Sequence, residues 1–195
     1  MSDWTTPLPC ETPAQGPALH LAARVAGEIP EIWTERLLLC APRIGDFPDY
    51  AEIVCGPRGK HFGSVSRDEA WLDFAQMVAG WVLRGHGLWT VTLRADASRK
   101  GFVLLGFEPE DREPELGYML CDGAEGEGYA TEAAAAVRDH AARAYGWTTL
   151  VSYVARDNHR SAAVAERLGA VLDPDALPDD DETLVYRHDL TRRAA

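Results

Sequence analysis

The sequence predicts one α/β domain built on a mixed, mostly antiparallel sheet with helices on both faces. Three observations lead to this fold class. Short β-like runs with tight charged connections come first, strands then alternate with helices, and no internal repeat is visible. The chain has 195 residues, of which 46% are hydrophobic. This is enough apolar mass for one core but too little for two full domains.

Residues 1–30 are rich in proline, glycine, threonine and alanine, with one apolar stretch at 18–25. Such a composition is typical of an extension outside the core. We expect this extension to be flexible, to lie over the domain, or to supply a helical turn. Residues 31–192 form the predicted single domain.

The first strand is predicted at residues 37–40, because an apolar run there ends just before Pro42. A short helix follows at 46–54 and stops at Gly56. A longer helix begins at Ser66, which forms a capping box with Glu69. Its apolar stripe has helical spacing and is predicted to pack in the core rather than against a ligand. The stripe comprises Trp71, Phe74, Met77, Val78, Trp81 and Val82.

Three β-like runs, at residues 88–93, 102–107 and 115–120, are separated by charged turns and predict an antiparallel meander. A helix at about 128–145 then carries alanines on one face, which allows close packing onto a sheet. A strand at 150–154, a helix at about 158–168 and a strand at 183–186 complete the predicted order.

Composition excludes several classes of function. The net charge of −12 opposes binding to nucleic acid and to anionic membranes. No apolar run is long enough for a membrane span, and the N-terminus lacks the residue order of a signal peptide, so we expect a cytoplasmic protein. The four cysteines and six histidines show no metal-site or disulfide spacing, which predicts free thiols and no metal.

The most informative segment is the glycine-rich stretch 123–132, between a predicted strand and a predicted helix. Glycines permit positive φ and let backbone N–H groups approach an anion at the helix N-terminus. The segment is not a Walker loop, and Thr131 stands where a dinucleotide motif needs its third glycine. It therefore predicts a pyrophosphate cradle, with a helix start that holds no ligand as the alternative.

Gly126-Glu-Gly-Tyr-Ala-Thr-Glu-Ala, after Glu115-Leu-Gly-Tyr-Met-Leu, resembles the acetyl-CoA loop of the GNAT acetyltransferases, and most resembles the branch of ribosomal-protein N-terminal alanine acetyltransferases. Further matches occur in the family's order, between residues 34 and 190. They are Thr34-Glu-Arg-Leu-Leu-Leu, Arg156-Asp-Asn-His-Arg-Ser161 and Glu166-Arg-Leu-Gly169. One departure is Gly123, where the family usually has glutamine or arginine.

The resemblance implies acetyl-CoA as co-substrate, with its pantetheine arm inserted between the splayed fourth and fifth strands. It implies that Met119, Leu120 and Cys121 line that arm. The residues implied to hold the pyrophosphate are Glu125, Gly126, Glu127, Gly128, Tyr129, Ala130 and Thr131. Asn158 is implied to steer the pantetheine or thioester end, although a helix N-cap is its alternative role.

Acetyl transfer needs a neutral amine, a polarised thioester carbonyl and a proton for the leaving thiolate. No covalent enzyme intermediate is required, so Cys121 is not expected to act as a nucleophile. Glu115 is the candidate base. Family members often have a tyrosine acid where this chain has Ala165, and the resemblance implies Ser161 as its substitute. Tyr118 is predicted to pack rather than to act as an acid.

The acceptor is predicted to be a small-molecule amine or a protein N-terminus, bound by residues in the region 43–87, which has no recognisable motif. The protein is expected to be a monomer or a homodimer. Two other functions remain open from sequence: a non-catalytic acyl-CoA-binding module, and a structural domain whose glycine loop holds nothing.

Overall fold

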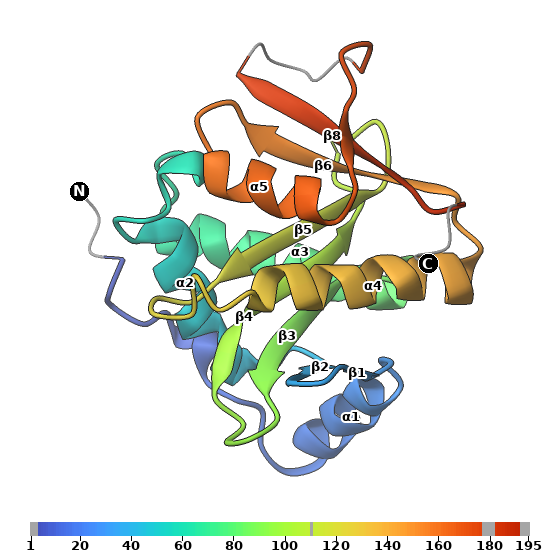
Figure 1. The fold of residues 1–195 in the computed structure, drawn as a ribbon. Helices are drawn as coiled ribbons and strands as arrows, with labels where there is room; N and C mark the ends of the chain where they lie inside the picture. The colour runs from blue at the N-terminus through green and yellow to red at the C-terminus, as the bar shows by residue number, and fades with distance from the viewer. Residues whose placement is uncertain (1–3, 110, 177–181, 192–195) are drawn as a thin grey trace.

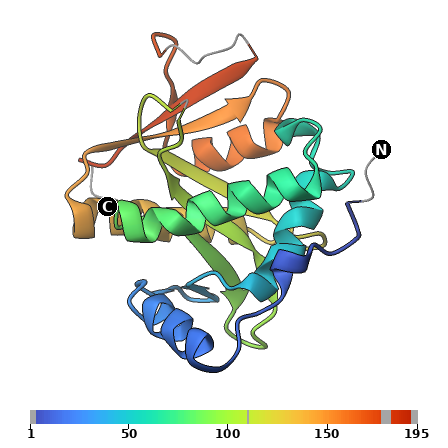
Figure 2. The same ribbon diagram turned by 180° about the vertical axis from the view of Figure 1, so that it is seen from behind.

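The structure is a computed structural model that describes residues 4–109, 111–176 and 182–191. Its described strands form one mixed sheet in the order β1-β2-β3-β4-β5-β6-β8-β7. Helices α2 and α3 cover one face of this sheet, and α4 and α5 cover the other (Figures 1 and 2). The predicted fold class is therefore confirmed.

The strands are β1 (Ile32–Trp33), β2 (Leu37–Cys40), β3 (Leu88–Leu93), β4 (Arg99–Gly106), β5 (Glu115–Leu120), β6 (Thr149–Ala155), β7 (Val171–Leu172) and β8 (Thr183–Asp189). The helices are α1 (Gly16–Gly27), α2 (Phe47–Cys55), α3 (Arg67–Leu83), α4 (Tyr129–Tyr145) and α5 (His159–Arg167).

Strands β2 to β5 form the predicted antiparallel meander, since each pairs with the next along the chain. The pairing of β4 with β5 is the most regular, running from Gly101 opposite Leu120 to Gly106 opposite Glu115. The two-residue strands β1 and β7 were not expected from the sequence. Strand β1 pairs with β2 at one edge of the sheet, and β7 pairs with β8 at the other.

The sheet forks between β5 and β6. These two strands are parallel and share one paired position, Glu115 opposite Val151, whereas β6 pairs with β8 over its whole length. At the fork, Ser152 Oγ donates to the carbonyl of Leu116 at 2.7 Å and lies 3.0 Å from Nε2 of the buried His188. The predicted splay is thus present. It falls between β5 and β6 because β1 adds a strand to the count.

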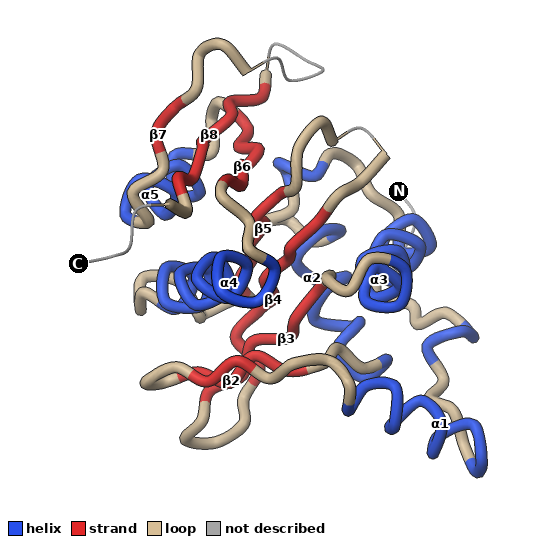
Figure 3. Tube along the Cα trace, turned by 90° about the vertical axis from the view of Figure 1, so that its right-hand side faces the viewer, coloured by secondary structure: helices blue, strands red, loops and turns tan. Residues whose placement is uncertain are grey.

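The two faces of the sheet carry different cores. Figure 3 shows α4 and α3 on opposite sides of the strands. On the α4 face, the small side chains of Ala133, Ala134 and Ala141 are buried against leucines and valines of the sheet. On the other face, the core is aromatic. Its rings come from α2, α3 and β4: Phe47, Tyr50, Phe74 and Phe102. The small residues bring α4 close to the strands, as the sequence predicted.

Helix α3 begins with the predicted capping box, in which Ser66 Oγ accepts from the Glu69 N–H and the Glu69 carboxylate accepts from the Ser66 N–H at 2.8 Å. Its aromatic stripe packs in the core, except at the end. Val82, predicted on the buried stripe, is 75% exposed. Its neighbour Trp81, also on the predicted stripe, does pack against the sheet, where its ring centroid lies 4.4 Å from that of Trp89.

The N-terminal segment contacts the domain at α3. The guanidinium of Arg67, a buried residue, donates to both carboxylate oxygens of Glu11 at 2.6 and 2.8 Å and to the carbonyl of Trp4 at 2.8 Å. Helix α1 follows and has exposed apolar side chains, including Leu21 and Val25. Within the described ranges, no helix combines the length and apolarity needed to cross a membrane.

Candidate active site

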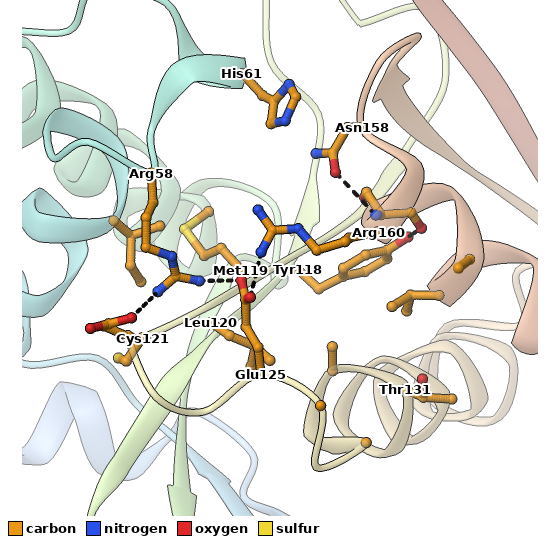
Figure 4. A pocket seen from close by; sticks show the side chains of 18 of the residues that line it. Arg58, His61, Tyr118, Met119, Leu120, Cys121, Glu125, Thr131, Asn158 and Arg160 are labelled. Atoms are coloured by element: carbon orange, nitrogen blue, oxygen red, sulfur yellow. Dashed lines mark hydrogen bonds and ion pairs between the residues drawn. The ribbon is translucent and has the colours of Figure 1, made fainter.

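A cleft with a volume of about 1460 Å³ opens where β5 and β6 separate. Its wall includes the C-terminal half of β5, the glycine-rich loop, and the first turns of α4 and α5 (Figure 4). The segment after α2 closes the opposite side with Arg58 and His61. A cleft of this size exceeds the usual range for drug-sized ligands, so it suits a long molecule.

The glycine-rich loop has the backbone geometry that the sequence predicted. Gly123, Gly126 and Gly128 have φ of 71°, 82° and 81°, in the left-handed region that favours glycine. Gly128 is the N-cap of α4, and no side chain caps the helix there. The first N–H groups of α4 are therefore available to an anion, and the helix dipole adds positive potential at the same place.

Hydrogen bonds join the glycine-rich loop and the start of α4 to the segment just before β2. They give the Thr34-Glu-Arg motif a role that the sequence did not reveal. The Glu132 carboxylate accepts from Arg36 Nε at 2.7 Å, from the Arg36 N–H at 3.0 Å, and from Thr34 Oγ1 at 2.5 Å. Arg36 also donates to the Glu127 carbonyl at 2.9 Å. The Thr34 to Arg36 segment thus fixes both the loop and the start of α4.

The predicted loop residues divide into two groups. The side of the loop that lines the cleft contains Glu125, Gly126, Gly128, Ala130 and Thr131. By contrast, Glu127 is exposed, and Tyr129 lies beneath Arg36, whose guanidinium carbon is 4.7 Å from the ring centroid. On β5, Met119, Leu120 and Cys121 all line the cleft.

Glu125 connects the two lips of the cleft (Figure 4). Its carboxylate accepts from Arg58, which follows α2, and from Arg160 in the first turn of α5. Arg58 also contacts Asp122 at 3.2 Å. The sequence motifs did not indicate this arrangement, since its members lie 67 and 35 residues apart. Two cations therefore stand at the mouth of a cleft in an otherwise acidic protein.

Asn158, Ser161 and Tyr118 meet at the inner end of the cleft. Asn158 Oδ1 accepts from the Ser161 N–H at 3.1 Å and so caps α5, while its side chain also lines the cleft. Tyr118 donates its hydroxyl proton to the Ser161 carbonyl at 2.8 Å. Burial raises the pKa of Tyr118 to about 12, so this hydroxyl stays protonated at neutral pH.

A second cavity, the inner chamber, lies behind these residues and has a volume of about 250 Å³. Six residues line both the cleft and the chamber: His61, Phe62, Tyr118, Met119, Asn158 and Ser161. Glu115 lines the chamber from β5. Burial, reinforced by the charges of Asp111 and Glu108, raises its pKa to about 8. A carboxyl with this pKa can exchange a proton near physiological pH.

Cys121 is placed for contact rather than for nucleophilic chemistry. Burial, with a contribution from Asp49, raises the pKa of its thiol to about 11. At neutral pH the side chain is therefore a thiol and not a thiolate. In the part of the chain that the structure describes, no group of three histidine, cysteine or acidic side chains is arranged to hold a metal ion.

The parallel strands β5 and β6, which fork beside the uncapped N-terminus of α4, form a site suited to a long molecule that carries a phosphate group. The sequence matches the acetyltransferase (GNAT) domain over residues 36–171. The chain belongs to the GNAT acetyltransferase family, and it is an N-acetyltransferase. No curated protein matches the sequence.

Solved structures support this assignment. An acetyltransferase from Agrobacterium tumefaciens str. C58 is 41% identical, with a TM-score of 0.80 over 83% of this chain and 95% of that one. The Salmonella typhimurium enzyme that modifies the N-terminal serine of ribosomal protein L7/L12 is 19% identical, with a TM-score of 0.64 over 82% and 99%. The microcin C7 self-immunity acetyltransferase MccE, in complex with acetyl-CoA and AMP, is 13% identical, with a TM-score of 0.61 over 80% and 93%. The last two likenesses show the fold alone.

Proposed function

We propose that this N-acetyltransferase transfers acetyl from acetyl-CoA directly to a primary amine within a ternary complex. The observation that carries the proposal is the meeting of the cleft and the inner chamber at Tyr118, Met119, Asn158 and Ser161. A thioester at the end of the cleft and an amine in the chamber would face each other there. Direct attack then needs no acetyl-enzyme intermediate.

The described residues fit acetyl-CoA along the whole cleft. The backbone at Gly126 and Gly128 and the first turn of α4 would hold the pyrophosphate. Met119, Leu120 and Cys121 would line the pantetheine arm, which can bond to the strand edge that β5 exposes beyond the fork. Arg58 and Arg160 stand where they could exchange Glu125 for a phosphate group. The MccE complex with acetyl-CoA supports this ligand.

Glu115 would act as the general base for the amine in the chamber. The incoming ammonium gives one proton to Glu115, and its nitrogen then attacks the thioester carbonyl. A C–N bond forms, the C–S bond breaks, and the leaving thiolate takes a proton. The Ser161 hydroxyl would deliver that proton, and it would regain one from the nitrogen of the tetrahedral intermediate. The products are an amide, CoA and the proton held by Glu115, which passes to solvent.

Leu120 has a separate proposed role, in which its backbone N–H stabilises the oxyanion of the tetrahedral intermediate. Tyr118 would act as a positioning residue, since its hydroxyl already donates to the Ser161 carbonyl. The acceptor class that the chamber favours is a small-molecule amine rather than a protein N-terminus, because the chamber is small.

Calorimetric titration of the protein with acetyl-CoA tests the first requirement of the proposal, which is that the protein binds acetyl-CoA. We expect one micromolar site, and CoA release that requires an added amine. Tight binding without turnover against a broad amine panel would instead favour a non-catalytic acyl-CoA-binding module. The absence of binding by the folded protein would contradict the assignment of the cleft.

A further inference from the structure

The cleft and the inner chamber differ in the kinds of charged side chain that line them. Three arginines, Arg58, Arg160 and Arg167, line the cleft together with five acidic residues. The described lining of the chamber contains no lysine or arginine, but includes the carboxylates of Asp73, Glu108 and Glu115. Its one histidine, His61, has Nδ1 3.0 Å from an oxygen of Asp157. A cationic acceptor would therefore enter a compartment whose described lining offers carboxylates and no lysine or arginine.

Asp73 is held rigidly at the α3 side of the chamber. It accepts a hydrogen bond from the hydroxyl of Tyr50, which is 1% exposed. The Tyr50 ring is in turn packed between Phe74 and Phe102, with centroids 5.4 and 5.6 Å away. This bond occupies Oδ2, and among the described residues Oδ1 has no hydrogen-bond partner or cation. A fixed, partly buried carboxylate with one oxygen to spare is suited to bind an ammonium group.

Asp73 and Glu115 reach the chamber from different elements, α3 and β5, and the charge on Asp73 acts on Glu115. Only one carboxylate can take the proton of the reacting amine. Glu115 is the better placed, because it lies on the strand that continues through Tyr118 and Met119 to the junction with the cleft. Asp73, which lines the chamber from α3, is left for a second positive group.

We propose that the acceptor is a small primary amine that carries a second cationic group, and that Asp73 is the residue that selects it; this inference rests on the proposed function. One amine reacts beside Glu115 while the other stays charged against Asp73. The volume of about 250 Å³ lies below the usual range of about 300–1,000 Å³ for drug-sized ligands, so a short diamine fits better than a bulky amine.

The test compares 1,4-diaminobutane with n-pentylamine as acceptors, since the two have equal length and differ only in the end group, which is an ammonium in the first and a methyl in the second. We expect wild-type kcat/KM to favour the diamine by about 30-fold or more, as for a buried charge that gains a partner. Asp73→Asn should remove this preference through KM of the diamine, while KM for acetyl-CoA stays unchanged. Asp68→Asn, on the exposed side of the same helix, is the matched control and should retain the preference.

The wild-type comparison needs no variant, so it decides the inference even if Asp73→Asn does not fold. Equal kcat/KM for the two amines, or an Asp73→Asn variant that slows both equally, would overturn the inference and leave the proposed function intact. Efficient acetylation of neutral-tailed peptides would overturn it in the same way. Loss of acetyl-CoA binding by the wild-type protein would instead contradict the proposed function itself.

Discussion

Glu115 combines a buried position with a neighbourhood of negative charge, and both raise its pKa, to about 8. Below that pH the carboxyl holds a proton and cannot accept another from the acceptor. We therefore predict that kcat/KM for the amine rises about tenfold per pH unit up to about pH 8 and then levels off. Steady-state rates between pH 6 and 9 measure this profile.

The variant Glu115→Gln separates the role of this carboxyl from the titration of the amine. It should lower kcat/KM by about 10²- to 10⁴-fold, the usual contribution of a general base, and should remove the rise toward pH 8. Acetyl-CoA affinity should be unchanged, since Glu115 lies in the chamber and not in the cleft. A variant that keeps the wild-type rate and profile would remove Glu115 from the mechanism.

At the scale of elements, the glycine loop before α4 allows a controlled comparison. Gly126 and Gly123 both have positive φ, and at either position a Cβ would meet no atom within 4 Å. Of the two, only Gly126 lines the cleft. Gly126→Glu and Gly123→Glu therefore carry the same backbone strain and the same added charge. We predict that only Gly126→Glu lowers acetyl-CoA affinity severely, by at least about 100-fold, as measured by calorimetry.

Equal losses in the two glycine variants would place the phosphates elsewhere. The thermal unfolding midpoint is the internal control, because a non-glycine residue at positive φ costs about 1–2 kcal/mol at either position.

The ion pairs of Glu125 with Arg58 and Arg160 connect the two sides of the cleft and should compete with the phosphates of acetyl-CoA. Replacing Glu125 by glutamine keeps the size of the side chain and removes its charge. We predict that Glu125→Gln binds acetyl-CoA several-fold more tightly, with a steeper dependence on salt, because both arginines then lose their ion pair with Glu125 and can bind phosphate instead. Stopped-flow binding at two salt concentrations measures the effect. Weaker binding would mean that Glu125 orders the loop rather than competing with the ligand.

At the scale of the whole molecule, the fork of the sheet contains a buried histidine that should make stability sensitive to acid. His188 is 1% exposed, and burial, together with nearby Arg138, lowers its pKa to about 4. The unfolded chain takes up a proton near pH 6.5, whereas the folded chain does so near pH 4. The stability that depends on a neutral His188 is therefore present above pH 6.5 and is lost as the pH falls to 4. The free energy of unfolding should decrease by about 3 kcal/mol over this range.

Urea denaturation between pH 7 and 4 measures this loss. His188→Gln keeps a hydrogen-bond donor near the position of Nε2, toward Ser152, but has no titrating ring, so its free energy of unfolding should fall less over the same range. Identical pH dependence in the two proteins would assign acid sensitivity to other groups, such as the ion pairs of Arg187 with Glu113 and Asp173.

The sequence predicted those parts of the fold that depend on nearby residues. The capping box of Ser66 and Glu69 spans three residues, and the alanine face of α4 repeats within each turn, so both were visible as patterns. The strands β1 and β7 were missed because two residues carry no period, and only their partners β2 and β8 define them.

The candidate site likewise contains parts that a local motif predicts and parts that depend on contacts between distant segments. The glycine loop is a local motif and was predicted, together with the residues of β5 beside it. The bond between Tyr50 and Asp73 joins residues 23 apart, and the ion pairs of Glu125 join segments farther apart still. Such pairs depend on how α2, α3 and α5 pack around the fork, and no single-sequence pattern reports that packing.

The measurement that tests direct transfer most sharply is an initial-rate study in which acetyl-CoA and a diamine acceptor are both varied, with mass spectrometry of the quenched enzyme. Transfer within a ternary complex predicts intersecting double-reciprocal lines and no acetylated protein. Parallel lines together with an acetyl group on Cys121 would contradict direct attack and show a covalent intermediate instead.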